Sequence, residues 1–221
     1  MRTLLVGINA KYVHTNLAIR NIAAYLKDED ISIYEATIND HVDGTLEYIV
    51  SFNADVIGFS CYLWNIEEVL CLAENIKKIR PETVIVLGGP EVSYDAEDLL
   101  KARPQIDYVI LGEGEERFGK LLKALGGKLL LASIDGIAYR NGSSIVVNPP
   151  KGYVDLNSLP FSYAGENLDN KLVYYETSRG CYFRCAFCLS SLESHVRFAD
   201  LEKVRQDFLR FAQMGVKVVK L

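Results

Sequence analysis

Asp55-Val56-Ile57-Gly58-Phe59-Ser60 is the stretch that decides the fold, because it is a short apolar run that ends in small residues. Such runs, without polar alternation, are typical of strands buried on both faces of a parallel sheet. Similar runs flank it, and patterns with helical spacing separate them. The predicted strands are 4–8, 31–38, 55–60, 83–87 and 108–111, and the predicted helices are 17–26, 42–52, 65–80, 96–101 and 116–125.

Five buried strands joined by crossover helices predict an α/β fold for residues 1–127. The expected architecture is a doubly wound parallel five-stranded sheet, Rossmann-like or flavodoxin-like. In such sheets a ligand binds beyond the carboxyl ends of the strands, where the strand order reverses. The loops at those ends contain the candidate cofactor-binding residues, which are Asn9, Tyr12, His14, Ser60, Cys61, Tyr62, Gly88, Gly89, Pro90, Glu91, Gly112, Glu113, Gly114 and Glu115. Glycine is also common in ordinary α/β turns, so these loops alone do not indicate which ligand would bind.

A second cluster of functional residues is formed by Cys181, Cys185 and Cys188, which are three of the five cysteines. Three thiols on one loop indicate a metal site. A 4Fe-4S cluster normally takes four thiolates, and structural zinc takes four cysteine or histidine ligands. With three local thiolates, one iron of a cluster would keep an open position for a small molecule. A zinc site completed by His195 stays an alternative, whereas a disulfide is less favoured because nothing suggests export.

The spacing Cys181-x3-Cys185-x2-Cys188, with Phe187 directly before the last cysteine, resembles the signature of radical S-adenosylmethionine enzymes. The resemblance implies that these cysteines bind a 4Fe-4S cluster, whose open iron binds S-adenosylmethionine for reductive cleavage. It also implies that Phe187 lies near the adenine. A low-potential electron donor and a small-molecule substrate would be the partners. No catalytic residue can be assigned.

Residues 1–127 are similar to the cobalamin-binding domain that precedes the catalytic domain in one branch of that family. The stretches that carry the similarity are 55–60, 86–91 and 107–115. The resemblance implies bound cobalamin and a methyltransferase or a radical cyclase. One departure is that the three histidines, at 14, 41 and 195, fit no Asp-x-His-x-x-Gly motif. Cobalamin would therefore bind without a histidine ligand from that motif.

The pattern changes after residue 127. A hairpin is predicted at 136–147, followed by a linker along the surface to residue 170. Residues 171–221 predict a strand at 172–176, the cysteine loop, a helix from 199 or 200 to Gly215 and a strand at 216–221. This order is one unit of a β/α barrel, which needs about 200 residues or more. We therefore expect the remainder of the barrel and the other S-adenosylmethionine contacts beyond Leu221, and an inactive 221-residue chain.

Composition narrows the class of protein further. The net charge of −5 and the absence of a basic run argue against nucleic acid as a partner. No secretory signal and no run of about 20 apolar residues is present, so a cytoplasmic protein without a membrane partner is expected. Cys71 falls in an apolar helical pattern and is expected in the core. Two other functions stay open, a cobalamin-binding sensor or carrier and a zinc-stapled structural module.

Overall fold

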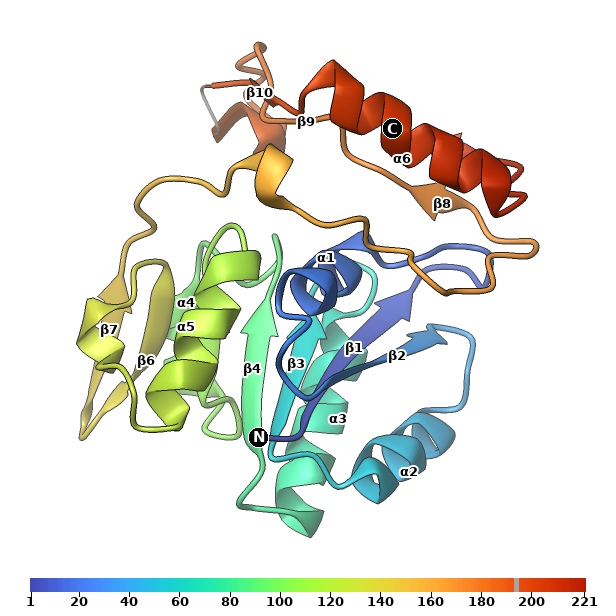
Figure 1. The fold of residues 1–221 in the computed structure, drawn as a ribbon. Coiled ribbons are helices and arrows are strands. Elements are labelled where there is room, and N and C mark those ends of the chain that lie inside the picture. Colours follow the sequence, from blue (N-terminus) through green and yellow to red (C-terminus); the bar gives the residue numbers. More distant parts are fainter. Residues whose placement is uncertain (193–194) are drawn as a thin grey trace.

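The computed structural model describes residues 1–192 and 195–221, and it shows an α/β sheet domain beneath a smaller C-terminal unit (Figure 1). The main sheet has the spatial order β2-β1-β3-β4-β5-β6-β7. Its strands are β1 (Thr3–Asn9), β2 (Ile31–Thr37), β3 (Val56–Ser60), β4 (Val84–Gly88), β5 (Tyr108–Ile110), β6 (Ile137–Asn141) and β7 (Ser144–Asn148). Its helices are α1 (Leu17–Tyr25), α2 (Val42–Phe52), α3 (Ile66–Ile79), α4 (Ala96–Ala102) and α5 (Glu115–Leu125).

The five expected parallel strands are confirmed. β1 pairs in parallel with β2 on one side and with β3 on the other, so the strand order reverses between β1 and β3. β4 and β5 continue the parallel pairing outward from β3. The carboxyl ends of β1 and β3 therefore form the switch point at which α/β sheets bind ligands.

The sheet has seven strands rather than the expected five, because the predicted hairpin joins it. β6 pairs antiparallel with β5, and β7 pairs antiparallel with β6. The hairpin turns at Gly142, whose φ of 61° suits a residue without a side chain. Ile137 and Ala138 are fully buried against the sheet. Without the hairpin, β5 would present an unpaired edge, which folded proteins avoid.

Side chains alternate across β1 and divide the core into two layers. Leu4, Val6 and Ile8 face the layer formed with α2, α3 and α4. Leu5 faces the opposite layer, where Ile19 of α1 and Phe118 of α5 pack. Figure 1 shows α1 and α5 on one side of the sheet and α3 on the other. Two-sided burial explains why the strands have apolar rather than alternating sequences.

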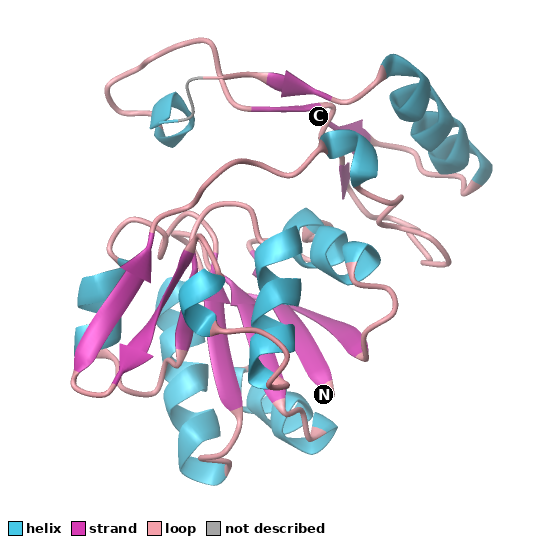
Figure 2. Ribbon diagram, turned by 60° about the vertical axis from the view of Figure 1, so that its left-hand side comes forward, coloured by secondary structure: helices cyan, strands magenta, loops and turns pink. Residues whose placement is uncertain are grey.

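The C-terminal unit lies over the carboxyl ends of the parallel strands (Figure 2). Its elements are β8 (Val173–Tyr174), β9 (Ser178–Arg179), the short 3-10 helix η3 (Leu189–Leu192), β10 (Arg197–Phe198), α6 (Leu201–Gln213) and β11 (Val219–Lys220). β8 and β11 pair in parallel, so the expected β–α–β order is confirmed. The antiparallel pair of β9 with β10 was not predicted. It brings together the two ends of the loop that carries the cysteines.

The segment between the hairpin and β8 packs more tightly than a surface linker. It contains the short 3-10 helix η2 (Leu156–Ser158), whereas the 3-10 helix η1 (Leu131–Ser133) precedes the hairpin. Tyr163 and Leu168 are buried in a third apolar cluster with Val173 of β8 and Phe211 of α6. The linker thus forms part of the core of the C-terminal unit.

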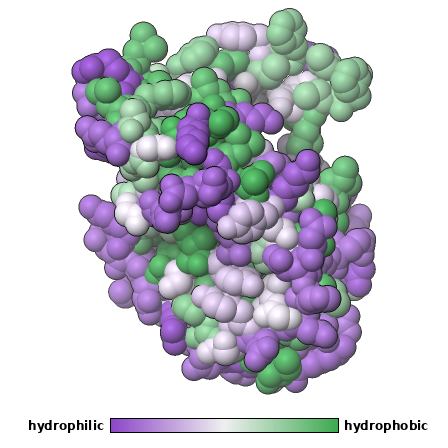
Figure 3. Space-filling view, turned by 90° about the vertical axis from the view of Figure 1, so that its right-hand side faces the viewer, coloured by the Kyte–Doolittle hydropathy of each residue, from purple (hydrophilic) through white to green (hydrophobic). Residues whose placement is uncertain are grey.

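Large apolar side chains are exposed on both units, and on the C-terminal unit they gather around the cysteine loop and α6. Figure 3 shows apolar surface gathered there, above a body that is mostly hydrophilic in this view. Tyr182, Phe183, Phe187 and Leu201 are each more than 70 % exposed. Within residues 1–192 and 195–221, no helix is long and apolar enough to cross a membrane.

Candidate functional site

A row of small residues crosses the sheet near the carboxyl ends of its strands. Gly7 of β1 lies in register with Ser60 of β3, and Ser60 lies in register with Gly88 of β4. Gly88 stands two residues after Val86, so both belong to the face that packs against α1 and α5. Because this row lacks large side chains, a narrow cavity of about 100 Å³ remains between the sheet and the two helices. Its walls include Leu5, Ile22, Ile110 and Phe118, and it is therefore an apolar slot.

A larger cleft of about 520 Å³ lies between the sheet domain and the C-terminal unit. Gly89, Gly112 and Gly114 line both this cleft and the apolar slot. The cleft therefore adjoins the slot. Its walls come from α1 (Leu17, Ala18, Asn21, Ile22), from the strand-end loops (Tyr62, Gly89, Pro90, Ser93, Tyr94, Gly112, Glu113, Gly114, Glu115) and from the C-terminal unit (Glu176, Ser178, Arg179, Gly180, Leu189, Ser190).

The turn after β4 is shaped by a close approach of two backbones. Gly89 has a φ of 110°, and a Cβ at this position would stand 2.5 Å from the carbonyl oxygen of Cys61. The Cys61 N–H donates to the carbonyl of Gly88 over 2.7 Å. Cys61 is completely buried, and its burial raises the pKa of the thiol to about 12. Cys61 therefore serves as packing and backbone support, and its thiol stays protonated at neutral pH.

Tyr62 lines both the cleft and a second cavity of about 350 Å³. Its ring stacks on Trp64 with ring centres 4.5 Å apart. Burial, with Glu176 nearby, raises the pKa of the Tyr62 phenol to about 12. Asn65 fixes this loop, since its side chain accepts from the Tyr62 N–H and donates to the carbonyls of Ile8 and Ser60.

The loop after β1 lines the second cavity rather than the main cleft. Asn9 and His14 lie on its wall, and the His14 ring meets Tyr174 edge-on at 5.6 Å. Tyr12 is 70 % exposed, and Lys171 lies over its ring at 3.9 Å. Tyr12, Cys61 and Glu91 do not belong to the described walls of the slot or of the two larger cavities.

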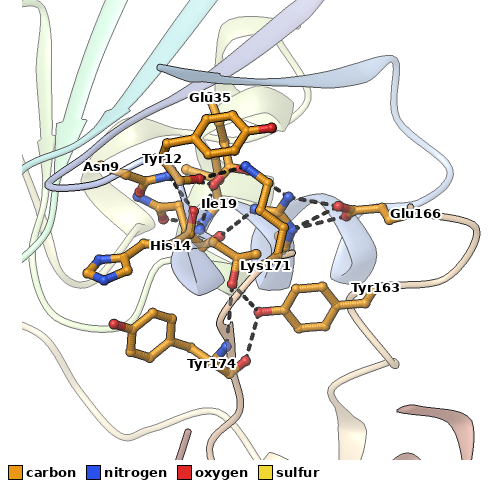
Figure 4. A network of polar contacts seen from close by, with 12 residues as sticks. Asn9, Tyr12, His14, Ile19, Glu35, Tyr163, Glu166, Lys171 and Tyr174 are labelled. Atoms are coloured by element: carbon orange, nitrogen blue, oxygen red, sulfur yellow. Dashed lines mark hydrogen bonds and ion pairs between the residues drawn. The ribbon is translucent and has the colours of Figure 1, made fainter. Parts of the chain in front are cut away.

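A polar network holds the linker against α1 (Figure 4). The buried guanidinium of Arg20 pairs with Glu35 and with Glu166, each over 2.7 Å. Burial alone would raise the pKa of Glu35, but the bonds from Arg20, Asn9 and Asn16 outweigh it and lower that pKa. The Tyr163 hydroxyl lies 3.0 Å from the Thr15 hydroxyl and donates to the Tyr174 carbonyl over 2.7 Å. The first strand of the C-terminal unit is thereby tied to the sheet domain.

The two carboxylates of the loop after β5 bind arginines of the C-terminal unit. Glu113 accepts from Arg179 over 3.1 Å and from Arg197 over 2.5 Å. Glu115 pairs with Arg179 over 2.6 Å. Burial alone would raise the pKa of Glu113, but Arg197, Arg179 and the Val154 N–H outweigh it and lower that pKa. In this loop Gly112 and Gly114 line the cleft, and the carboxylates of Glu113 and Glu115 bind the C-terminal unit to the sheet domain.

The three cysteines lie on one loop and form no disulfide. Cys181 and Cys188 are half-buried, and Cys185 is exposed. The Phe183 N–H points at the Cys181 sulfur over 3.4 Å, and the Cys188 N–H donates to the Cys185 carbonyl over 3.1 Å. Phe187 is 95 % exposed. Among residues 1–192 and 195–221, no three cysteine, histidine or acidic side chains converge as a ready metal site.

The slot and the cleft suit a large ligand with one apolar extension. A row of glycines lets such a ligand approach the backbone, and the apolar walls accept the part that enters the sheet. For a cluster, the donor chemistry fits, since three thiols without disulfide partners stand on one accessible loop. That loop borders the cleft through Gly180, Leu189 and Ser190.

The sequence alone did not reveal several residues of the cleft. Ala18, Asn21 and Ile22 belong to an amphipathic helix and carry no motif. Glu176 and Arg179 offered one signal, namely that they lie five and two residues before the first cysteine. Cys71 was expected in the core, but it is exposed, because Val69, Leu72, Ala73 and Ile76 take the buried face of α3.

Comparison with protein families gives one match. Residues 3–122 match the family described as the B12 binding domain. The matched range begins with β1 and ends within α5, so it covers the five parallel strands and the loops that border the slot.

Curated proteins that are similar in sequence include a methyltransferase and a cyclase. The cobalamin-dependent radical SAM methyltransferase TokK of Streptomyces tokunonensis is 28 % identical over 229 residues, which cover 97 % of this chain and 32 % of TokK. The anaerobic magnesium-protoporphyrin IX monomethyl ester cyclase of Synechocystis is 33 % identical over 119 residues, 49 % of this chain and 23 % of the cyclase. The chain spans less than half the length of the curated relatives it matches.

Among solved structures, the cobalamin-dependent S-adenosylmethionine radical enzyme OxsB, with aqua-cobalamin and S-adenosylmethionine bound, superposes with a TM-score of 0.80. The match covers 98 % of this chain and 33 % of OxsB, at 21 % identity. At this identity the likeness shows a common fold, which includes the C-terminal unit.

Proposed function

The chain belongs to the B12-binding domain family, and on this premise we propose that it carries both cofactor sites of a cobalamin-dependent radical S-adenosylmethionine enzyme. The reaction class that we propose is methyl transfer to a carbon of a small molecule. TokK, a methyltransferase, aligns with 97 % of this chain, whereas the anaerobic magnesium-protoporphyrin IX monomethyl ester cyclases that match align with 49 % to 76 % of it. A low-potential electron donor would be the partner.

The observation that carries this proposal is that one cleft borders both candidate sites. The glycine turns of the B12-binding domain form its floor, and Gly180, which directly precedes Cys181, belongs to its opposite wall. A reaction that uses two cofactors in turn needs both within reach of one substrate. The cleft provides a common space for that substrate.

The residues assigned to each cofactor follow from this arrangement. Ser60, Gly88 and Gly89 would hold cobalamin along the slot, and Cys181, Cys185 and Cys188 would hold a 4Fe-4S cluster. When bound, the cluster supplies the electron that cleaves S-adenosylmethionine, and cobalamin supplies a transferable methyl group.

The chain's own side chains would bind and orient within the cleft. Tyr62 stays a neutral phenol and presents an aromatic wall to the ligands. Glu176 is 45 % exposed in the cleft and is held by Arg179 over 2.8 Å. Its carboxylate can accept a hydrogen bond from a substrate or from a ligand side chain.

One reconstitution experiment separates this proposal from its alternatives. The 221-residue chain is incubated anaerobically with iron, sulfide and hydroxocobalamin, passed through a gel-filtration column and analysed for metals. The proposal predicts about four iron atoms and one cobalt per chain. Cobalt without iron would favour a cobalamin sensor or carrier. Retained zinc with neither iron nor cobalt would favour a structural module. Either of these results refutes the two-cofactor proposal.

A further inference from the structure

We propose that Glu113 is a positioning residue, which clamps both ends of the cysteine loop to the sheet domain and thereby sets the separation of the two cofactor sites. This inference rests on the proposed function, since it concerns the same cleft. It adds a role that neither the cysteine spacing nor the B12-binding match assigns.

The two ends of the cysteine loop meet at one point. Arg179 of β9 and Arg197 of β10 are direct partners in the antiparallel pair that closes the loop. Both arginine side chains reach the same oxygen, Oε1 of Glu113, over 3.1 and 2.5 Å. A single carboxylate of the sheet domain therefore holds the base of the loop on both sides.

The remaining oxygen of Glu113 is also used. Its Oε2 accepts from the Val154 N–H over 2.7 Å, and the Val154 carbonyl accepts from Arg197 over 3.0 Å. The Glu113 side chain is 10 % exposed and that of Arg179 is 13 % exposed. A pair shielded to this degree is strongly coupled, and removing one partner leaves an uncompensated charge.

Glu113 is itself rigidly placed on the sheet domain. Its carbonyl accepts from Arg117 over 2.9 Å, and Arg117 pairs with Asp135 over 2.8 Å. Gly112, directly before it, turns the chain with a φ of 70°. The carboxylate is thus a fixed point at the end of β5 and the beginning of α5.

A shift in the position of Arg179 would also move Cys181, the first cysteine of the loop. Only Gly180 separates Arg179 from Cys181, and Gly180 has a φ of 95°. A Cβ on Gly180 would stand 2.2 Å from the His195 carbonyl oxygen, so the chain has little freedom to bend there. Glu115 and Glu176 take the other nitrogens of Arg179, over 2.6 and 2.8 Å. The guanidinium therefore cannot turn without breaking three ion pairs.

The test compares Glu113→Gln with Glu116→Gln in the 221-residue chain. Glutamine at 113 keeps the shape and an acceptor for Val154 but removes the charge that holds two arginines. Glu116 stands three residues along the chain and pairs with Lys120 of the same helix over 3.5 Å. It therefore controls for the loss of one negative charge near the same helix end.

The first readout is amide hydrogen exchange in the cofactor-free protein. We expect segments 178–180 and 196–198 to exchange at least about tenfold faster in Glu113→Gln than in the parent. Glu116→Gln should match the parent. Unchanged protection in β1, β3 and β4 will show that the sheet domain stays folded. Equal exchange of both loop ends in Glu113→Gln and the parent would overturn the clamp.

The second readout is the magnetic coupling between reduced cluster and cob(II)alamin in the reconstituted chain. The parent should give one narrow distance distribution, and Glu113→Gln should give a broader or displaced one with iron and cobalt contents unchanged. An identical distribution in the two proteins would refute the positioning role. If the parent binds no iron or no cobalt, the proposed function fails, and that outcome is distinct because the exchange measurement is still interpretable.

Discussion

Gly88→Val is the substitution that tests the apolar slot most sharply, because it should leave the fold intact while blocking the ligand. A Cβ at Gly88 would meet no atom closer than 3.8 Å, which is an ordinary contact. Replacing glycine in a strand with a β-branched residue also favours the extended backbone. We therefore expect a melting temperature equal to that of the parent or higher.

The cost to binding follows from the size of the slot. Its volume of about 100 Å³ is of the order of one apolar side chain, and the valine methyl groups would occupy it. Excluding an apolar group of that size from burial loses about 1.5–3 kcal/mol. At about 1.4 kcal/mol per factor of ten, the dissociation constant for cobalamin should rise about 10- to 150-fold.

The assay is an absorbance titration of the chain with hydroxocobalamin, accompanied by thermal unfolding of each variant. Gly44→Val is the matched control, since Gly44 lies on α2 with no neighbour within 4 Å and stands outside the slot. A Gly88→Val protein that is folded and binds cobalamin as tightly as the parent would refute the reasoning about the slot.

Three further predictions concern stability. Gly89→Ala should lower the melting temperature by about 5 °C, since the left-handed φ costs about 1–3 kcal/mol and the Cβ meets the Cys61 carbonyl. Gly127→Ala, with a φ of 74° but open surroundings, should lower it less, and equal losses would contradict the role of the contact. Arg20→Met should cost about 3 kcal/mol or more in urea unfolding, because Glu35 and Glu166 lose their shared cation. Arg205→Met on the exposed side of α6 should be neutral, and similar losses would argue against the network. The pKa of Asp135 is held at about 2, because the Lys151 N–H and Arg117 outweigh its burial, and the pKa of Glu35 is lowered too. Both folded-state pKa values lie below the unfolded ones of about 4, so the unfolding free energy should be constant near neutral pH and fall as pH drops from about 5 toward 2. A urea midpoint that does not change over this range would be inconsistent with these ion pairs.

The sheet could be predicted because its signals are local. Runs such as 55–60 are mostly apolar, which is typical of strands that helices cover on both faces of a sheet. The strand-end loops could be placed for the same reason, since carboxyl ends of parallel strands share one edge. The start of α1 is local as well, since Asn16 is of a residue type that caps helices and its side chain accepts from the Ile19 N–H.

Contacts between distant parts of the chain could not be predicted. Glu115 and Arg179 are 64 residues apart, and no local sequence pattern near either residue indicates that the two side chains pair. The pairing of β6 with β5 depends on which sheet edge is free, and this is a property of the assembled sheet. Tyr163 was assigned to a surface segment because its neighbours show no periodicity, although its ring is buried beside Phe211.

The most direct test of the two-cofactor account is the iron and sulfide content of single cysteine variants after anaerobic reconstitution. The parent and Cys71→Ala should each hold about four iron atoms per chain, since Cys71 lies exposed on α3 and outside the cysteine loop. Cys181→Ala, Cys185→Ala and Cys188→Ala should each lose most of that iron and sulfide. Retention of the parental iron and sulfide by all three variants would contradict the assignment of the cluster to this loop.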